Sequence, residues 1–366
     1  MKIVEIIPQL ASGGAERFVV DLSNELSKSS DVFLISFYDS EVANFYSCEL
    51  LKDVSHIIIR KELGFSPKLF FKLSKVLKQI DPDVIHLHLD AINYIVPFLL
   101  LNRKYKCFMT IHNDAFKEAG SVLGRNIRNF CFKTKLINPI TISTESQRSF
   151  IACYKTNAPV VFNGRFMPSE IFISQEVKNE FLNYKKNKNT RILVNLARFS
   201  HVKRQPLIAK CVKRLYEEGY NFTMLMIGQN RAEDVLQEVQ NYKCPALFVL
   251  GEKKNPLEYL KLADAYCLLS TYEGLPISLI EALATETIPV CTPVGGIVDI
   301  VTNGDNGLLS KDLSEDEVYA VLKKFLLMTD VEMSAMKKRS MESFADYSIE
   351  NTALQYYNLF YSELKP

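Results

Sequence analysis

The sequence has no run of apolar residues long enough to cross a membrane. Its longest such run, residues 91–101, contains Asn93 and Pro97 and is much shorter than the roughly 20 residues that a membrane helix needs. The amino terminus lacks a signal-peptide pattern, because Glu5 interrupts its short apolar run and Pro8 ends it. We therefore expect a cytoplasmic protein that does not span the membrane.

The eight cysteines include no Cys-x-x-Cys pair and follow no regular spacing. Several lie in apolar, strand-like segments, such as Cys267 within residues 266–269. Such cysteines are typical of buried, reduced thiols rather than of a disulfide framework, which agrees with a cytosolic protein.

The two common phosphate-loop motifs are also missing, since there is no Gly-x-Gly-x-x-Gly and no glycine loop followed by Gly-Lys-Ser/Thr. Instead, a strand at residues 2–7 leads through Gly13 and Gly14 into a helix with an apolar stripe. Backbone N–H groups at such a helix start can approach an anion closely. An equally simple interpretation is that the two glycines only form the turn.

Net charge is small, +2, but it is unevenly distributed. Residues 101–135 hold eight basic and two acidic residues (8 − 2 = +6), interleaved with aromatic residues at 105, 108, 116, 130 and 132. This stretch is either a solvated basic face or a site for anionic lipid or a phosphate-bearing acceptor. No feature of the chain favours a nucleic-acid partner.

A chain of 366 residues is too long for one ordinary core and indicates two domains. Strand-like and helical segments alternate in each half, which predicts largely parallel sheets. The alternation weakens between residues 163 and 190, so we place the domain joint there. We expect an α/β protein with domains at residues 1–168 and 169–345 and a helical segment at 346–366. Strands are expected at residues 2–7, 31–37, 55–59, 84–89, 107–111, 140–143, 160–162, 191–196, 222–227, 246–250, 265–269 and 288–291.

A cluster of cations follows the first strand of the second half. Arg198 offers a fork for bidentate phosphate binding, Lys203 offers a point charge, and His201 lies between them. Taken alone, these residues could equally be exposed loop cations.

Two glutamates, Glu273 and Glu281, bracket a glycine turn with seven residues between them. Pro276 suits the first position of a helix, so we expect the helix to start there. Helical spacing directs Glu281 away from the core. Both carboxylates are then expected to face the rim of an open α/β sheet, where such sheets bind ligands.

Histidines mark the ends of two strands in the first half. His86 and His88 share one strand face, and His112 ends the next strand. Two alternating histidines could hold zinc, but no third ligand is evident. Substrate contact or hydrogen-bonded burial is the simpler expectation, and we predict no metal site.

Together these residues resemble the retaining, nucleotide-sugar-dependent glycosyltransferases of family 4. The resemblance is carried by residues 12–17 (Ser-Gly-Gly-Ala-Glu-Arg), residues 83–88, His112, Arg198 with Lys203, and the segment from Glu273 to Glu281. It implies the GT-B architecture: two Rossmann-like doubly wound domains facing a cleft, with a C-terminal helix crossing back to the first domain.

The resemblance also implies the roles of the site residues. Glu281 would bind the ribose of the donor, Glu273 the transferred sugar, Arg198 and Lys203 the diphosphate, and His112 the outer hydroxyls of the sugar. The residues with implied catalytic roles are His112, Arg198, Lys203 and Glu273. The residues implied to contact the donor are Gly13, Gly14, Arg198, Lys203, Gly228, Gly251, Glu273, Gly274, Leu275, Pro276 and Glu281. The sequence departs from the family pattern at Arg165, Ala197, Arg204 and Asp299.

The implied activity is transfer of a hexose-type sugar from a UDP-sugar, without a metal or other cofactor. The implied acceptor is a saccharide on a polyprenyl diphosphate, and the implied process is synthesis of capsule, O-antigen or exopolysaccharide. The basic stretch would give peripheral contact with an anionic membrane. Three alternatives are a nucleotide-sugar 2-epimerase of the same fold, a non-catalytic sugar-nucleotide-binding relative, and a hydrolase that uses the two glutamates. A hydrolase mechanism would give no role to Arg198 and Lys203.

Overall fold

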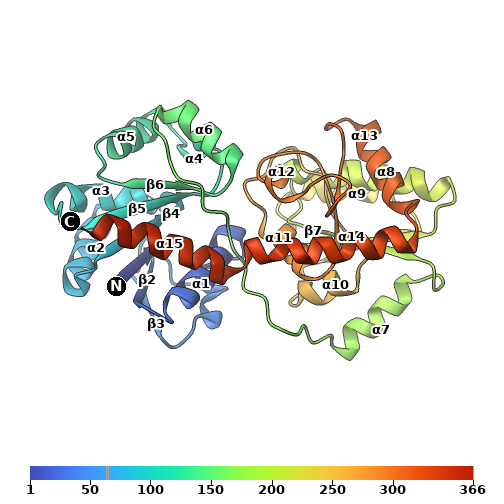
Figure 1. The fold of residues 1–366 in the computed structure, drawn as a ribbon, viewed down its shortest axis with the longest axis horizontal. Helices are drawn as coiled ribbons and strands as arrows, with labels where there is room; N and C mark the ends of the chain where they lie inside the picture. Colours follow the sequence, from blue (N-terminus) through green and yellow to red (C-terminus); the bar gives the residue numbers. More distant parts are fainter. Residues whose placement is uncertain (63, 65, 366) are drawn as a thin grey trace. The chain divides into compact units, whose positions relative to one another are not determined.

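The computed structural model describes residues 1–62, 64 and 66–365, and it divides into two compact units. Unit 1 comprises Met1–Phe166 together with Tyr347–Pro366, and unit 2 comprises Met167–Asp346. Pro366, the last residue of the predicted C-terminal segment, lies outside the described residues. Each unit contains one six-stranded parallel sheet with helices (Figure 1).

The sheet of unit 1 has the order β3-β2-β1-β4-β5-β6. All five residues of β4 are buried, so both faces of the sheet are covered there. The register places Glu5 of β1 opposite His86 of β4. The strands are β1 (Lys2–Ile6), β2 (Asp31–Ser36), β3 (Val54–Ile58), β4 (Val84–His88), β5 (Lys106–Ile111) and β6 (Asn138–Thr141).

The sheet of unit 2 has the order β12-β11-β10-β7-β8-β9. Counted from its own first strand, this is the same order as in unit 1, and it is the order of the Rossmann fold. In each sheet the strand order reverses between the first and fourth strands, which are β1 and β4 in unit 1 and β7 and β10 in unit 2. The strands are β7 (Arg191–Leu196), β8 (Phe222–Ile227), β9 (Leu247–Gly251), β10 (Ala265–Leu268), β11 (Ile288–Cys291) and β12 (Leu308–Leu309).

Helices fill the connections between the strands. Unit 1 contains α1 (Gly14–Leu26), α2 (Pro67–Ile80), α3 (Ile92–Leu101), α4 (Ala115–Glu118), α5 (Val122–Lys133), α6 (Thr144–Tyr154) and α15 (Ile349–Leu364). Unit 2 contains α7 (Gln175–Tyr184), α8 (Gln205–Glu217), α9 (Glu233–Gln240), α10 (Pro256–Leu262), α11 (Ile277–Ala284), α12 (Ile297–Ile300), α13 (Glu315–Leu326) and α14 (Asp330–Ser343).

The C-terminal helix α15 belongs to unit 1, as the fold prediction required. It packs beside α1 (Figure 1), and its side chains Tyr356 and Phe360 are fully buried. These two aromatic residues reach the sheet, because the Phe360 ring lies 4.8 Å from that of Phe108 in β5. Burial of such large side chains contributes several kcal/mol and fixes the helix to this unit.

Arg165 lies near one of the two places where the chain passes from one unit to the other, and it forms backbone hydrogen bonds with the segment at the second place. Its backbone N–H donates to the carbonyl of Tyr347, and its own carbonyl accepts from Ile349. Its guanidinium donates to Asp21 of α1 at 2.7 Å, and both side chains are buried. Burial raises the pKa of the Asp21 carboxyl, although Arg165 opposes that shift. This pair explains how a buried arginine is accommodated at this position.

Two predicted elements were wrong in detail. The strand expected at residues 160–162 is a single bridge between Val160 and Thr141, because the chain leaves the edge of the sheet there. The helix expected to start at Pro276 starts at Ile277, and Pro276 is its extended N-cap residue. Proline fixes φ near −65° but leaves ψ free, so it suits the cap as well as the first turn.

All eight cysteines are free thiols, and Cys107, Cys131, Cys211, Cys267 and Cys291 are buried as predicted. Cys48 is exposed, which the prediction of buried thiols did not anticipate. Within the described ranges, no helix combines the length and the apolarity that crossing a membrane requires.

Candidate functional site

The predicted site residues of unit 2 lie in the loops that follow its parallel strands. Arg198 comes two residues after β7 and is exposed, and no side chain in the described part of the chain pairs with its guanidinium. Lys203 ends a short 3-10 helix, η4 (His201–Lys203), in the same loop. Both cations therefore lie at the carboxyl edge of the sheet, where α/β proteins bind ligands.

Buried hydrogen bonds fix the shape of this cationic loop. The side chain of Gln205 is fully buried; its amide N–H donates to the Arg198 carbonyl at 2.8 Å, and its oxygen accepts from the Ser200 N–H at 3.3 Å. The N–H of Thr271, in the loop after β10, donates to the Val202 carbonyl at 2.9 Å. The loops after β7 and β10 are thus joined at the point where the strand order reverses.

Lys203 and Glu273 form a direct ion pair across these two loops. The Lys203 ammonium lies 2.6 Å and 2.8 Å from the two carboxylate oxygens of Glu273. The side chains are 17% and 8% exposed, so the pair is largely shielded from water. The structure therefore joins two site residues that are far apart in the sequence and that were predicted for the same ligand.

Glu281 lies in the second turn of α11 and is only 9% exposed. The prediction that both glutamates face outward was wrong in this respect, since both carboxylates are mostly covered. Nearby, Ser278 of α11 and Tyr266 of β10 share a hydrogen bond of 2.6 Å. Burial raises the pKa of the Tyr266 phenol well above its ordinary value, so this group stays protonated.

Close backbone approach explains two glycines near the site. Gly295 has φ +54°, and a Cβ there would overlap the carbonyl oxygen of Glu273. The neighbouring Gly296 donates its N–H to the Gly274 carbonyl at 2.6 Å. A Cβ at Gly228 would likewise overlap the carbonyl of Ala197, just before Arg198. These glycines let loops pack against the residues that carry the charges.

Gly251 and Arg204 have positive φ values for a different reason. At Gly251, φ is +67° and a Cβ would meet open space, so the turn conformation alone favours glycine. Arg204 adopts φ 54° and ψ 34° directly after Lys203. This left-handed conformation is one that glycine adopts more easily than arginine. Burial lowers the pKa of the Arg204 guanidinium.

The predicted residues of unit 1 lie at the amino end of α1 and the carboxyl end of β5. Gly13 is the N-cap of α1, and Gly14 is its first residue. The Glu16 carboxylate lies against Gly13, so a carboxylate already occupies the neighbourhood of this helix start. Phe18 of α1 packs edge-on against the His112 ring at 5.9 Å, which joins the two predicted positions.

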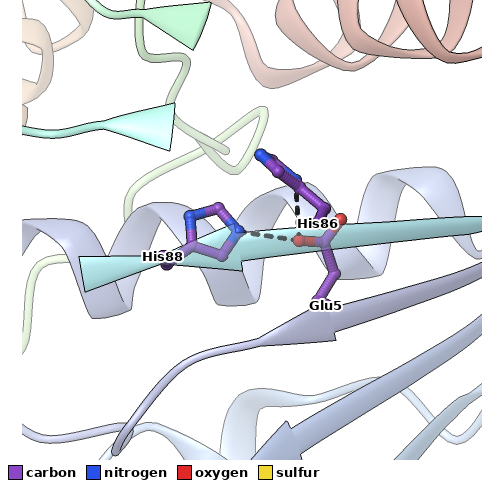
Figure 2. Close-up of side chains that lie close together, drawn as sticks. All are labelled: Glu5, His86 and His88. Atoms are coloured by element: carbon purple, nitrogen blue, oxygen red, sulfur yellow. Dashed lines mark hydrogen bonds and ion pairs between the residues drawn. The ribbon is translucent and has the colours of Figure 1, made fainter. Parts of the chain in front are cut away.

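A buried network connects His112 to the inside of the sheet, and Figure 2 shows three of its members, Glu5, His86 and His88. The Glu5 carboxylate accepts a hydrogen bond from His88 Nε2 at 2.7 Å, and His86 Nδ1 lies 2.8 Å from the same oxygen. His88 Nδ1 lies 2.9 Å from His112 Nε2. Glu5, His86 and His88 are fully buried, and His112 is 5% exposed.

A second branch of the network runs to the C-terminal helix. His86 Nε2 lies 2.8 Å from Thr110 Oγ1, which lies 2.9 Å from the hydroxyl of Tyr356. Strands β1, β4 and β5 and helix α15 therefore share one set of polar contacts. Buried polar groups are stable only when they are paired in this way.

The network perturbs the pKa values of its members. Burial alone would raise the pKa of Glu5, but the charge and hydrogen bonds of His86 and His88 outweigh it and lower the pKa to about 2. Burial and the charge of His86 lower the pKa of His88 to about 4. Burial, with the charges of His88 and His86, lowers the pKa of His112 well below its ordinary value.

The same residues offer the geometry of a small metal site. One ligand atom from each of Glu5, His86 and His88 lies within 4.8 Å of the others. Each imidazole nitrogen of the two histidines, however, already lies within 2.9 Å of a protein partner. A metal ion would have to replace the contacts to Glu5, so hydrogen-bonded burial accounts better for these histidines.

A buried carboxylate holds the loop that carries His112. Glu118 accepts hydrogen bonds from the backbone N–H groups of His112 and Asn113 at 2.9 and 3.1 Å, and Arg128 lies 3.6 Å from its other oxygen. Burial raises the pKa of Glu118 to about 7, although Arg128 and the two N–H groups oppose the shift. Glu118 therefore fixes the backbone at the end of β5.

The basic stretch at residues 101–135 does not form one continuous surface. Tyr105, Phe108 and Phe132 are buried in the core, and the buried Arg128 pairs with Asp90 and Glu118. A smaller apolar surface remains on α5, which we call the α5 face. It consists of the exposed side chains Val122, Leu123, Ile127 and Phe130 on one side of the helix, with the exposed Lys133 at its end.

Glu5, Thr110 and Tyr356 were not predicted as site residues. A sequence signal existed for Glu5, because it is a charged residue within an apolar strand and follows no alternating pattern. Thr110 and Tyr356 carry no comparable signal, since their roles depend on strand register and on the packing of α15.

Family models match both parts of the chain. The model described as Glycosyltransferase Family 4 matches residues 12–164, and the model described as Glycosyl transferases group 1 matches residues 176–342. The first range contains Gly13, Gly14 and His112, and the second contains Arg198, Lys203, Glu273 and Glu281.

Individual proteins are similar over most of the chain. One is an N-acetylgalactosaminyltransferase of Campylobacter jejuni whose name gives an undecaprenol-diphosphate-linked saccharide, with 26% identity over 90% of this chain and 89% of the relative. Another is the O-antigen biosynthesis glycosyltransferase WbnH of Escherichia coli, with 24% identity over 96% of both chains. Among solved structures, Anabaena HepE in complex with UDP superposes with a TM-score of 0.81, at 16% identity over 99% of this chain and 100% of that one.

Proposed function

We propose that this chain, which belongs to the glycosyltransferases of the family 4 type, transfers a hexose-type sugar from a nucleotide sugar to a saccharide acceptor during synthesis of a cell-surface polysaccharide. The observation that carries the proposal is the shielded Lys203–Glu273 pair beside Arg198, in loops at the reversal of strand order in unit 2. A site of this kind presents cations and a carboxylate to one ligand that contains both phosphate and hydroxyl groups.

The chemistry follows from the charges. When the bond between the sugar and the diphosphate breaks, negative charge develops on the diphosphate and positive charge on the sugar ring. Arg198 and Lys203 would stabilise the diphosphate, helped by the unpaired N–H groups at the start of α11. Such preorganised charges supply leaving-group stabilisation without a metal ion. Metal independence is testable by turnover in the presence of EDTA.

The two glutamates would bind hydroxyl groups rather than transfer protons. Glu273 neutralises Lys203 and can also accept a hydrogen bond from the transferred sugar. Glu281, one turn beyond Ser278 in α11, would accept hydrogen bonds from the donor ribose. We propose the same donor role for Gly13, Gly14, Gly228, Gly251, Gly274, Leu275 and Pro276, and a role for His112 at the outer hydroxyls of the sugar.

UDP is the proposed nucleotide, and the proposed acceptor is a saccharide on a polyprenyl diphosphate bound by unit 1. Support comes from the UDP in the HepE complex and the lipid-linked saccharide in the name of the Campylobacter relative. Family membership further supports retention of anomeric configuration, with a donor phosphate oxygen assisting deprotonation of the acceptor hydroxyl.

A screen of nucleotide sugars by thermal shift tests the donor assignment directly. A donor that binds the native state raises the melting temperature, and at equal concentration a tighter donor raises it more. We expect a UDP-sugar to give the largest shift and Glu281→Ala to weaken nucleotide binding in calorimetry. Unchanged nucleotide binding by Glu281→Ala would refute the ribose assignment.

Product analysis separates the proposed transferase from its alternatives. Conversion of the donor sugar in the absence of acceptor would identify a 2-epimerase. Release of free sugar from a simple glycoside without nucleotide would identify a hydrolase. Donor binding without turnover, over a range of lipid-linked acceptors, would identify a non-catalytic relative.

The α5 face supports a further part of the proposal, namely peripheral contact with an anionic membrane. Its four exposed apolar side chains would insert between the lipid headgroups. The ammonium group of Lys133 would interact with the negative charge of those headgroups. We expect salt-dependent binding to vesicles that contain anionic lipid and weaker binding by Leu123→Glu. Leu182→Glu is a matched control, because Leu182 is an exposed leucine on α7 of unit 2. No vesicle binding at low salt would refute membrane contact.

A further inference from the structure

We propose that Glu5 and His88 are positioning residues that hold the His112 imidazole with its proton on Nε2, so that Nδ1 accepts a hydrogen bond from a sugar hydroxyl. The inference rests on the proposed function, because that function supplies the sugar. It assigns a role to three residues of the buried network, of which only His112 was predicted as a site residue.

Glu5 determines which nitrogen of His88 carries a proton. An ionised carboxylate can only accept hydrogen bonds, so the contact of 2.7 Å requires a proton on His88 Nε2. Glu5 is fully buried and cannot exchange this partner for water. The carboxylate therefore determines which nitrogen of His88 carries the proton.

The position of the proton on His88 in turn determines its position on His112. A neutral imidazole protonated on Nε2 has Nδ1 as its acceptor, and the low pKa of His88 keeps it neutral near pH 7. His88 Nδ1 lies 2.9 Å from His112 Nε2, so His112 must donate from Nε2. The neutral His112 ring then has its remaining lone pair on Nδ1.

The Nδ1 atom of His112 determines what the ring can bind. Among the residues that the structure describes, none forms a hydrogen bond with Nδ1 of His112, and the ring retains 5% exposure at the carboxyl end of β5. Phe18 packs against the ring, and Glu118 fixes the backbone N–H of the same residue. The ring therefore cannot turn its protonated nitrogen outward without breaking the bond to His88.

The consequence is selectivity for a hydroxyl donor. A buried acceptor left without a partner is unfavourable, because it has lost its hydrogen bonds to water and gained none from the ligand. A sugar that lacks the hydroxyl facing Nδ1 would therefore react more slowly than one that has it. Among the residues that the structure describes, the branch through His86, Thr110 and Tyr356 forms no hydrogen bond with His112, so it provides an internal comparison.

The test is nitrogen-15 NMR of the full chain labelled at histidine. The chain has only five histidines, and single His→Gln variants assign their signals. We expect His112 in the wild-type protein to be protonated on Nε2 and not on Nδ1. We expect Glu5→Met, which removes the acceptor, to shift His112 toward the Nδ1-protonated form. Tyr356→Phe and His56→Gln should leave the signal of His112 unchanged.

Several outcomes would overturn the proposal. One is a proton on His112 Nδ1 in the wild-type protein, which decides the matter even if Glu5→Met does not fold. Another is an unchanged His112 signal in folded Glu5→Met. A third is a stoichiometric metal ion in the purified protein that is lost in Glu5→Met.

Kinetics provides the functional arm of the test. Once a donor is identified, Glu5→Met should lower kcat by about 10–100-fold, as loss of supporting partners does at other sites. The tautomer of His112 is read without any substrate. Absence of turnover with every nucleotide sugar would therefore refute the proposed function, whereas a wrong tautomer would refute only this inference.

Discussion

The two units have the same strand order, but their charged residues lie in different places relative to the point where that order reverses. In unit 2, Arg198 is exposed at the sheet edge and Lys203 pairs with Glu273 in the loops beyond the strands. In unit 1, Glu5, His86 and His88 lie within the strands and are fully buried. Unit 2 places its charges in loops at the edge of its sheet, and unit 1 encloses them within its strands.

This difference separates two ways in which a polar group can serve a site. A loop cation acts by direct contact, so its removal affects binding and rate without disturbing the core. A buried carboxylate acts through its neighbours, and its removal leaves unpaired polar groups in the interior.

Arg198→Ala should separate activity from stability in unit 2. We expect kcat to fall by about 100–1000-fold, because one preorganised charge at the leaving group is lost. The free energy of unfolding should change by no more than about 0.5 kcal/mol, since Arg198 is exposed and unpaired within the described residues. Arg231→Ala is the matched control, because Arg231 is also exposed in unit 2. Turnover and urea unfolding measure the two quantities, and full activity of Arg198→Ala would contradict the leaving-group argument.

Protonation of His88 in acid should destabilise unit 1, against an opposing gain from Glu118, whose pKa is raised to about 7 so that the native state binds a proton that the unfolded chain releases. The pKa of His88 is lowered to about 4 in the folded state, so the native protein binds fewer protons than the unfolded chain between pH 4 and 6.5. Stability from His88 is therefore complete above pH 6.5 and is lost as the pH falls toward 4, by at most about 3 kcal/mol. Below about pH 4.5, protonation of Glu5, whose pKa is lowered to about 2, adds to the loss.

Hydrogen exchange resolved by peptide, and corrected for intrinsic rates, would assign this acid effect to one unit. In a Glu118→Gln background, which removes the opposing titration of Glu118, we expect the strands β1, β4 and β5 to lose protection between pH 6.5 and 5 while β7 and β10 retain theirs. His56→Gln is the control, because His56 lies on β3 and bonds Ser36 outside the network. Equal loss of protection in both sheets would remove the contrast between the units.

The sequence was sufficient for the architecture but not for the pairing of charges. Alternation of strands and helices predicted two doubly wound units, because the period of the apolar residues is a local property. The contact between Glu5 and His86, which are 81 residues apart in the chain, depends on the register of two strands, and no local pattern encodes it. The grouping of Lys203 with Glu273 came from the family resemblance, and the structure supplied the direct ion pair.

The basic stretch shows the same limit. Charge and aromatic content indicated one surface at residues 101–135, yet Phe108 and Phe132 are core residues of a strand and a helix. Composition alone does not distinguish the two faces of an element, whereas packing does.

Gly295→Ala should test how closely the Glu273 turn is supported. Strain at positive φ and overlap with the Glu273 carbonyl should together cost about 1–3 kcal/mol more than a substitution at an open turn. Gly304→Ala is the matched control, since Gly304 also has positive φ but no neighbouring atom. Thermal unfolding measures the difference in stability between the two variants. An equal loss of stability in both would show that the Glu273 turn can shift to accommodate a Cβ at residue 295 without an energetic penalty.

The smallest effect should come from Tyr356→Phe, which removes one hydroxyl from the enclosed network. Thr110 keeps its contact with His86, so only one hydrogen bond is lost, and we expect a destabilisation of about 1 kcal/mol. Tyr356→Ala also removes a fully buried ring that packs on Phe18 and His86, and it should cost about 3–5 kcal/mol. Urea unfolding of the two variants thus separates hydrogen bonding from packing in the attachment of α15. If Phe cost as much as Ala, the hydroxyl would hold the C-terminal helix, and unit 1 would depend on its polar network more than on its aromatic core.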